Sequence, residues 1–357
     1  MPSLDQISLL LVWTAVAIYA VAFIFYTIDL ARRSAQSLDA KDAATREREL
    51  VGAVAGSRSL SEVASRSSSE RSETKRPTGA AHRSIDSSRS PLAVAPSQRV
   101  RPVFARIGTS LTWLAFLFHV GGDVTRGIAS GRVPWSNMYE FALTGVMLMA
   151  AVYLGVLFRY DLRFLGALIT GLAVLLLGGS TLAFYVDVAP LSDPLKSPWL
   201  VIHVFVASLA TAFFALTFGL SLLQLLQTRR EHKAVLAGDK PVKSWGFLKT
   251  LPSSEALESL AYRFAIVGFI FWTFTLIAGS IWANDAWGRF WGFDTKEVWT
   301  FIIWVLYAGY IHARATRGWR GTRSAWLAII GFAAVLFNFV VVNVFFKGLH
   351  AYSGLTS

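Results

Sequence analysis

Two groups of residues in this sequence could support chemistry: a cluster of tryptophans and a set of histidines in apolar surroundings. The tryptophans lie in the stretch WANDAWGRFWGFDTKEVW, residues 282–299. If this stretch is helical, Trp287, Trp291 and Asp294 are spaced i, i+4 and i+7 and share one face. Two indoles and a neighbouring phenyl ring would then form a flat apolar shelf for a flat, polarizable ligand.

Arg289 and Lys296 lie in the same stretch, so the expected ligand carries anionic groups that would pair with them. Two simpler interpretations stay open. Tryptophan is enriched wherever a protein crosses a membrane interface, although such belts need neither fixed spacing nor interleaved glycines. Asp294 and Glu297 also match an Asp-x-x-Glu capping box that would start the next helix, which does not exclude a second role.

Four of the six histidines lie in or beside apolar runs, where an ionisable side chain is costly unless it has a partner. Imidazole is a common metal ligand, and an interhelical hydrogen bond is the alternative role. His203 and His350 lie on either side of the tryptophan-rich stretch in the sequence, whereas His119 and His312 lie within apolar runs. The other two histidines lie in polar segments and are expected to be solvated: His82 and His232.

The composition indicates a membrane protein. Of 357 residues, 54% are hydrophobic and 16% charged, and the mean hydropathy is +0.49. Soluble domains have about 45–50% apolar and about 25% charged residues, so a soluble enzyme is excluded. The absence of cysteine excludes a disulfide, a thiolate metal site and a thiol nucleophile. The net charge of +12 is typical of basic cytoplasmic loops in such a protein, and no nucleic-acid partner is expected.

The apolar runs predict an all-α fold, a polytopic bundle of about eight transmembrane helices. The first run lacks a preceding basic region and is too long for a cleaved signal peptide, so residues 1–30 are expected to form a transmembrane helix. Residues 31–104 form a Ser/Arg-rich linker that is expected to be disordered, and residues 105–357 form the main transmembrane domain. The expected spans are 7–28, 105–127, 138–158, 163–186, 199–227, 262–282, 297–316 and 324–346.

Lysine and arginine orient these spans. The cytoplasmic segments collect 28 of the 34 basic residues, and without the linker the split is still 14 against 6. Both termini and the tryptophan-rich loop are then expected on the outer face. The segments assigned to the cytoplasm are 31–106, 159–163, 228–263 and 313–323.

The run Trp287-Gly-Arg-Phe-Trp-Gly-Phe-Asp-Thr-Lys-Glu297 resembles the tryptophan-rich WWD signature of the haem-handling proteins of cytochrome c biogenesis. That signature usually reads W-G-x-x-W-x-W-D-x-x-E. Within the superfamily the chain is most similar to the CcsA/ResC branch of system II, called CcsB in some actinobacteria. It departs from the pattern at Phe293, which keeps a stacking face but lacks the indole N–H donor of the usual tryptophan.

Three further elements of that family have counterparts in the same order along this chain. Residues 135–140 resemble an S-N-x-Y-E element at the outer end of the third span, residues 310–314 a histidine-bearing helix end, and residues 349–352 an outer C-terminal histidine. The resemblance covers the chain from about residue 105 to its end and leaves out the linker.

The resemblance implies haem b as the cofactor. It implies a transmembrane pair of iron ligands at His119 and His312 and an outer pair at His203 and His350, with Asp294 joining the outer pair as the catalytic group. The implied cofactor-binding loop residues are Trp287, Trp291, Phe293, Asp294 and Arg289. Other outer cations could pair with a haem propionate, but an ordinary interfacial charge is favoured for each of them: Arg126, Arg132 and Lys347.

The implied activity is export of haem across the bacterial cytoplasmic membrane and its presentation on the outer aromatic shelf. There the haem vinyl groups would react with the thiols of a Cys-x-x-Cys-His segment of apocytochrome c, so the sulfur comes from the substrate. The chain would be a component of a membrane holocytochrome c synthase (haem lyase) complex. The implied partners are a ResB-type membrane protein and thiol-reducing thioredoxin-like proteins.

Two other functional classes stay open. A transporter of another planar or anionic solute would have helices interrupted in mid-membrane, for which Gly121-Gly122 and Gly178-Gly179 are candidates. A membrane-complex scaffold would use the tryptophan-rich loop to dock another protein, independently of the histidines. Haem-delivery proteins of system I share the signature, but the linker after the first span and the Leu349-His350 tail favour system II.

Overall fold

The structure is a computed structural model that describes residues 3–35, 103–191, 193–238, 246–316, 318–346 and 348–350. The chain divides into two units, one formed by Met1–Ser34 with Val103–Ser357 and the other by Ala35–Pro102. Apart from Ala35, the second unit lies outside the described residues, and so does nearly all of the predicted linker. The first unit is all-α throughout its described part.

Within the described ranges, seven helices are long and apolar enough to cross a membrane. An eighth helix, α8 (Thr295–Thr316), has 22 residues and is long enough to span a bilayer, but it is less apolar than the other seven. All eight helices lie where the apolar runs predicted them, so the chain is a multi-pass helical membrane protein. The seven are Leu4–Ala35, α2 (Val103–Ser130), α3 (Met138–Leu157), Arg163–Phe184, α6 (Pro198–Ala237), α7 (Ser254–Trp287) and Thr322–Phe345.

Two of these spans are composite helices that contain a π turn. The fourth span consists of η1 (Arg163–Leu165), α4 (Gly166–Ala173), the π turn η2 (Val174–Gly178) and α5 (Gly179–Phe184). The last consists of α9 (Thr322–Phe337), the π turn η5 (Asn338–Val342) and α10 (Asn343–Phe345). Two short 3-10 helices, η3 (Asp193–Lys196) and η4 (Gly246–Thr250), lie in the connections.

Neither glycine pair considered for a transporter interrupts its helix. Gly121 and Gly122 lie inside α2, where the carbonyl of Gly122 accepts a hydrogen bond from Ser8 of the N-terminal helix at 2.7 Å. Gly178 and Gly179 join η2 to α5 without unwinding. Gly122 lets α2 approach the N-terminal helix closely, because a Cβ there would be 2.8 Å from Val12, whereas a Cβ at Gly179 would meet open space.

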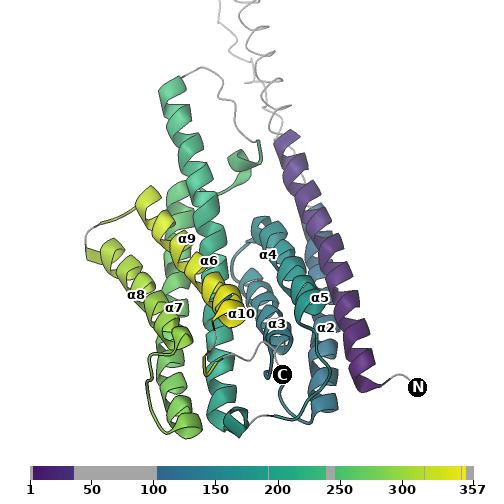
Figure 1. Cartoon of the computed structure of the whole chain (residues 1–357). Coiled ribbons are helices and arrows are strands. Elements are labelled where there is room, and N and C mark those ends of the chain that lie inside the picture. Colours follow the sequence, from purple (N-terminus) through teal and green to yellow (C-terminus); the bar gives the residue numbers. More distant parts are fainter. Residues whose placement is uncertain are drawn as a thin grey trace, which may run out of the picture. The chain divides into compact units, whose positions relative to one another are not determined.

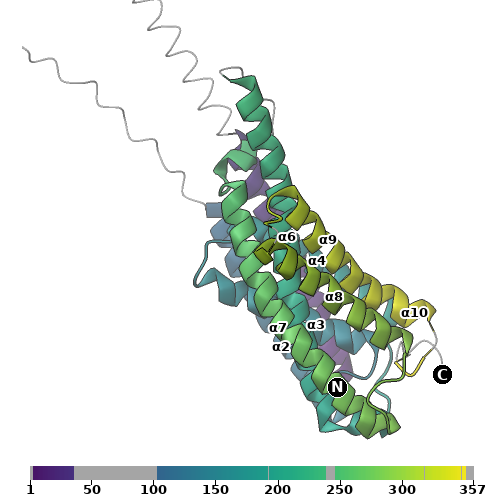
Figure 2. The same cartoon turned by 90° about the vertical axis from the view of Figure 1, so that its left-hand side faces the viewer.

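Helix α6 packs against α3, α7 and α9, while α8 packs against α7 and α9. Figure 1 shows the purple N-terminal helix and α2 on one side of α6, with α7 and α8 on the other. Figure 2 shows α7, α8 and α9 beside one another on the face turned to the viewer. The rings of Phe214 and Tyr307 stack in the core at 3.6 Å between centroids, and Gly268 brings the backbone of α7 close to Phe214.

One end of the bundle is tied together by Glu258 of α7. Its carboxylate binds Nε of Arg314 in α8 at 3.1 Å, Nε2 of Gln224 in α6 at 3.2 Å, and the backbone N–H of Gly321, just before α9, at 2.8 Å. The opposite end holds the beginnings of α6 and α8, the end of α7 and the residues that follow α10; we call it the tryptophan end. That the tryptophan end faces outward stays a prediction.

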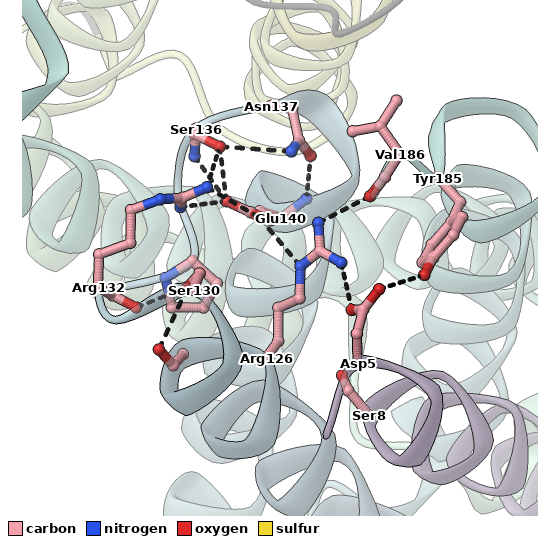
Figure 3. A network of polar contacts seen from close by, with 12 residues as sticks. Asp5, Ser8, Arg126, Ser130, Arg132, Ser136, Asn137, Glu140, Tyr185 and Val186 are labelled. Atoms are coloured by element: carbon pink, nitrogen blue, oxygen red, sulfur yellow. Dashed lines mark hydrogen bonds and ion pairs between the residues drawn. The ribbon is translucent and has the colours of Figure 1, made fainter. Parts of the chain in front are cut away.

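A buried ion-pair network fixes the first helices at the tryptophan end (Figure 3). Arg126, at the end of α2, donates from Nε to Glu140 of α3 at 3.0 Å and also pairs with Asp5 of the N-terminal helix. Its Nη2 donates to the carbonyl of Val186 at 2.8 Å, and Arg132 donates to Glu140 at 2.7 Å. Arg126 and Glu140 have no exposed surface, so the network is built into the fold.

The N-terminal helix is also fixed by Tyr26. The Tyr26 ring lies so close to two other helices that a Cβ at Gly108 of α2 would come within 3.1 Å of it and one at Gly166 of α4 would overlap it. Three residues further along the same helix, Oδ1 of Asp29 accepts a hydrogen bond from the backbone N–H of Ala105 at 3.2 Å. The two glycines on the facing helices thus leave the space in which the large Tyr26 ring packs.

Candidate functional site

The tryptophan-rich stretch is not a single helix. Helix α7 ends at Trp287, Gly288 takes a left-handed conformation with φ 69°, and α8 begins at Thr295. The Gly288 N–H closes the helix on the carbonyl of Asn284 at 2.9 Å, a common way to end a helix. The predicted helical face shared by Trp287, Trp291 and Asp294 is therefore wrong.

The loop aromatic residues divide into an inner and an outer group. Trp287 turns inward, with its ring centroid 4.9 Å from that of Trp282 and 4.9 Å from that of His350. Phe293 faces outward, with 79% of its surface exposed, and matches the aromatic belt of a membrane interface. Phe290 is 59% exposed but lines, together with Trp291, the cavity described below. Trp287 does not line that cavity and packs against the rings that do.

Glu297 holds the loop in its turn. Its Oε2 accepts the backbone N–H groups of Gly292 at 2.8 Å and of Asp294 at 3.1 Å. Between these two residues Phe293 has φ 57°, a conformation that an aromatic residue rarely adopts and that needs such support. The capping-box prediction is confirmed for Glu297, whereas the Asp294 carboxylate binds a different partner.

That partner is His350. Nδ1 of His350 lies 2.6 Å from Oδ2 of Asp294, and because a carboxylate only accepts, Nδ1 carries the proton. In the neutral ring, Nε2 then keeps its lone pair. The imidazole lies edge-on to Trp282 and Trp287, with centroids 5.3 and 4.9 Å away. Asp294 and two tryptophans thus orient the C-terminal histidine.

His203, near the start of α6, is oriented in the same way. Its Nδ1 donates to the backbone carbonyl of Thr275 in α7 at 2.9 Å, which again leaves the lone pair on Nε2. The ring stacks on Trp282 at 5.8 Å with 23° between planes. It lies so close to α7 that a Cβ at Gly279 would be 2.7 Å from it. His203 and His350 therefore both contact the indole of Trp282.

The two histidines line one cavity of about 230 Å³ at the tryptophan end. Most of its wall is apolar and comes from α3, α6, α7 and α9, with Trp291 at its edge. Trp282 belongs to a small apolar core that forms part of the cavity wall. That core contains Trp135, Leu195, Leu200 and Val204. The cavity thus combines two imidazoles, large aromatic rings and apolar surface.

Residues 135–350 match the family described as "Cytochrome C assembly protein", a span of well over half the chain. The chain belongs to this family. The proteins named "Cytochrome c biogenesis protein CcsA" include similar relatives. The one from Guillardia theta is 37% identical over 245 residues, which cover 65% of this chain and 80% of the relative. The one from Prochlorococcus marinus subsp. pastoris is 38% identical over 268 residues, which cover 68% and 82%.

The family match begins at Trp135 and ends at His350, so it includes His203 and the whole tryptophan-rich loop. It also includes His312 but leaves out His119 and the N-terminal helix. The geometry of the outer pair thus lies wholly within the part that marks this chain as a cytochrome c assembly protein.

The two transmembrane histidines are not brought together. His119 is buried on α2, where Nε2 donates to the carbonyl of Leu143 at 2.8 Å, Nδ1 has no partner among the described residues, and the ring lies edge-on to Tyr19. His312 lies exposed on α8, which packs on α7 and α9 at the other side of the bundle (Figure 1). A shared ligand site for this pair stays a prediction.

The predicted cations have mixed roles. Arg126 and Arg132 are engaged by Glu140, and Arg289 lies against the backbone of Gly292, where a Cβ would overlap its guanidinium group. None of these three lines the cavity. Two other predicted residues, Lys347 and His82, lie outside the described residues, and His232 is exposed on α6.

Three residues that position the site escaped the sequence-based prediction: Thr275, Gly279 and Trp282. They are spaced i, i+4 and i+7, so they form one face of α7, the face turned to His203. The helical periodicity was visible in the sequence. What was missing was the partner, because His203 lies on another helix more than 70 residues away.

The Asp294–His350 pair gives a prediction for pH dependence. The hydrogen bond from His350 and the backbone N–H groups of Leu349 and Thr295 hold the pKa of Asp294 below its ordinary range. Because the pKa of Asp294 is lower in the folded than in the unfolded protein, the pair adds stability at pH values above the unfolded pKa of about 3.9. This stability is lost only as the pH falls through the folded pKa. We therefore expect residues 348–350 to stay docked between neutral pH and about pH 4.

Hydrogen–deuterium exchange of the C-terminal peptide would measure this docking. Asp294→Asn should raise exchange there already at neutral pH, because it removes the charge from the acceptor. Equal protection in Asp294→Asn and the unchanged protein at neutral pH would contradict a docking role for the pair.

Proposed function

We propose that the tryptophan end binds haem b between His203 and His350 and presents it for covalent attachment to apocytochrome c. One observation carries this proposal. Both histidines line one cavity, and each donates from Nδ1 to a fixed acceptor, which leaves Nε2 available. Histidines that ligate a metal almost always make this kind of outer hydrogen bond, because it fixes the tautomer and the ring orientation.

The residues fit haem in three respects. They offer two neutral imidazoles, aromatic rings that can pack on a macrocycle, and an apolar wall. The cavity of about 230 Å³ is below the range of about 300–1,000 Å³ that encloses a drug-sized ligand. A larger macrocycle would therefore project from it, which suits presentation to a second protein. The vinyl groups of haem supply the electrophile, and the sulfur must come from apocytochrome c because this chain has no cysteine.

The two histidines have different roles in this proposal. His203 is fixed on α6, a long helix in the centre of the bundle, and is the permanent ligand. His350 lies in a turn at residues 348–350 and is held by Asp294, so it can be exchanged at lower cost for the histidine of the incoming substrate. Asp294 acts as a positioning residue that keeps His350 in the correct tautomer.

The remaining parts of the proposal rest on the resemblance to the system II branch. The tryptophan end would face outward from the bacterial cytoplasmic membrane, and haem would reach it by way of His119 and His312. The chain would work as part of a holocytochrome c synthase complex with a ResB-type membrane partner, and thioredoxin-like proteins would keep the substrate thiols reduced. The unpartnered Nδ1 of buried His119 is compatible with a ligand role.

An absorption spectrum of the purified, detergent-solubilised protein tests the proposal. Protein produced together with a ResB-type partner should show a low-spin bis-imidazole spectrum, and His203→Ala/His350→Ala should lose it. His232→Ala, which changes an exposed histidine, is the matched control and should leave the spectrum unchanged. Protein that contains no haem, or haem that survives the double substitution with an unchanged spectrum, would refute the outer site.

Gly279→Ala gives a finer prediction. The added methyl group would collide with the His203 ring, so the ring must move away from Thr275 and from its ligand position. We expect a shifted or high-spin spectrum in a protein that remains folded. The control is Gly309→Ala on α8, where a Cβ meets open space. An unshifted spectrum in Gly279→Ala would mean that the position of His203 is not set by α7.

A further inference from the structure

One cationic side chain in the described part of the chain, that of Lys296, lines the cavity. Its Nζ donates to Oδ1 of Asn343 at 2.6 Å, and Nδ2 of Asn343 donates to the carbonyl of Phe339 at 2.7 Å. Asn343 follows the π turn η5 directly. The ammonium group is therefore held at a defined position by the end of the last span.

The ammonium group has no carboxylate partner among the residues that the structure describes. It has three N–H donors, and Asn343 takes one of them. Neither neighbouring acid forms an ion pair with it: Asp294 binds His350, and Oε2 of Glu297 binds the loop backbone. Oε1 of Glu297 has no partner among the described residues, and Glu297 also lines the cavity. A cation that faces an apolar cavity is costly unless an anion pairs with it, so this arrangement is suited to an anionic group brought by the ligand.

The other cations that the structure describes at this end offer no alternative. Arg126 and Arg132 bind Glu140, and Arg289 lies on Gly292 away from the cavity wall. A carboxylate that enters the cavity would therefore meet Lys296 before any other cation of the described chain.

We infer that Lys296 binds a propionate carboxylate of the porphyrin and makes the cavity selective for free-acid porphyrins over esterified ones. This inference rests on the proposed function and adds to it the residue that sets ligand orientation. With one propionate fixed at the start of α8, the macrocycle edge that carries the vinyl groups would point away from Lys296. That edge is the one that must meet the thiols of apocytochrome c.

Binding titrations with two probes test the inference. The apoprotein in detergent is titrated with iron protoporphyrin IX and with its dimethyl ester, and the absorption change gives both dissociation constants. The unchanged protein should bind the free acid about ten- to a hundredfold more tightly, the range expected for a charge-assisted hydrogen bond. Lys296→Gln should reduce this ratio to near one by weakening binding of the acid alone.

Three variants serve as controls. Lys196→Gln removes the same charge from an exposed residue of η3 that does not line the cavity, and it should keep the full ratio. Lys296→Arg keeps the charge and should keep most of the preference. Asn343→Leu leaves Lys296 in place without its hydrogen-bond acceptor, so it should give an intermediate ratio even if Lys296→Gln does not fold.

The outcomes separate this inference from the proposed function. Low-spin binding of acid and ester with equal affinity by the unchanged protein would overturn the role of Lys296 and leave the histidine site standing. A preference that persists in Lys296→Gln would also overturn it, because another group must then bind the carboxylate. Absence of low-spin binding for both probes would refute the histidine site and the inference together.

Discussion

Trp282→Ala should abolish the low-spin haem spectrum and destabilise the protein by about 3–5 kcal/mol. The side chain is 2% exposed, belongs to the small core that contains Trp135 and Leu200, and contacts the rings of His203 and His350. Removing the indole would enlarge the cavity at the expense of this core, and both histidines would lose the surface that orients them.

Haem absorption and thermal unfolding measured on the same preparation separate the two effects. Trp282→Phe is the conservative control, since it keeps a ring at this position and should retain most of the spectrum. Trp326→Ala, which changes a half-exposed tryptophan of α9 far from the cavity wall, should leave the spectrum unaltered. An intact low-spin spectrum in folded Trp282→Ala would show that the histidines are oriented without the indole.

Glu140→Ala should destabilise the protein by about 3–5 kcal/mol, because it removes the fully buried carboxylate from an ion-pair network. The carboxylate accepts from Arg126, from Arg132, and from both the backbone N–H and the hydroxyl of Ser136. Without it, buried Arg126 retains only Asp5 as a carboxylate partner, and the loop before α3 loses the hydrogen bonds that place Trp135 against Trp282.

Thermal unfolding in detergent would measure this loss, with Asp193→Ala as the matched control. The Asp193–Lys196 pair also lies at the tryptophan end, but it is exposed to solvent and should contribute little to stability. A haem spectrum that weakens in Glu140→Ala would indicate that the network supports the site through Trp135. Similar unfolding temperatures for Glu140→Ala and Asp193→Ala would contradict the structural role of the network.

The helices were predictable from the sequence because each span must be apolar for about 20 residues to cross a bilayer. The ends of the helices were less predictable. Helix α6 continues to Ala237 and α7 begins at Ser254, both beyond the apolar runs. Hydropathy detects only the part of a helix in contact with lipid or core, and it gives no sign of a polar extension that is stabilised by its own backbone hydrogen bonds.

The site was predicted only in part, because its residue types are visible in the sequence whereas their partners are not. Gly288 carried a helix-stop signal, yet the spacing of Trp287 and Trp291 suggested one continuous face. The outer histidines were identifiable, but the acceptors of their Nδ1 protons, Thr275 and Asp294, lie on other elements. Such pairings depend on helix packing, which no local pattern encodes.

The packing of Tyr26 against α2 and α4 bears on how the first helix assembles with the rest of the bundle. The first helix is held near its start by Asp5 and towards its end by Asp29 and by the Tyr26 ring, which lies between Gly108 and Gly166. The position of the first helix is therefore set by the contacts of its own side chains and not by its covalent connection to α2. A chain cut between the first and second spans should reassemble from its two pieces, and the length of residues 36–102 should be free to vary among relatives without moving the first helix.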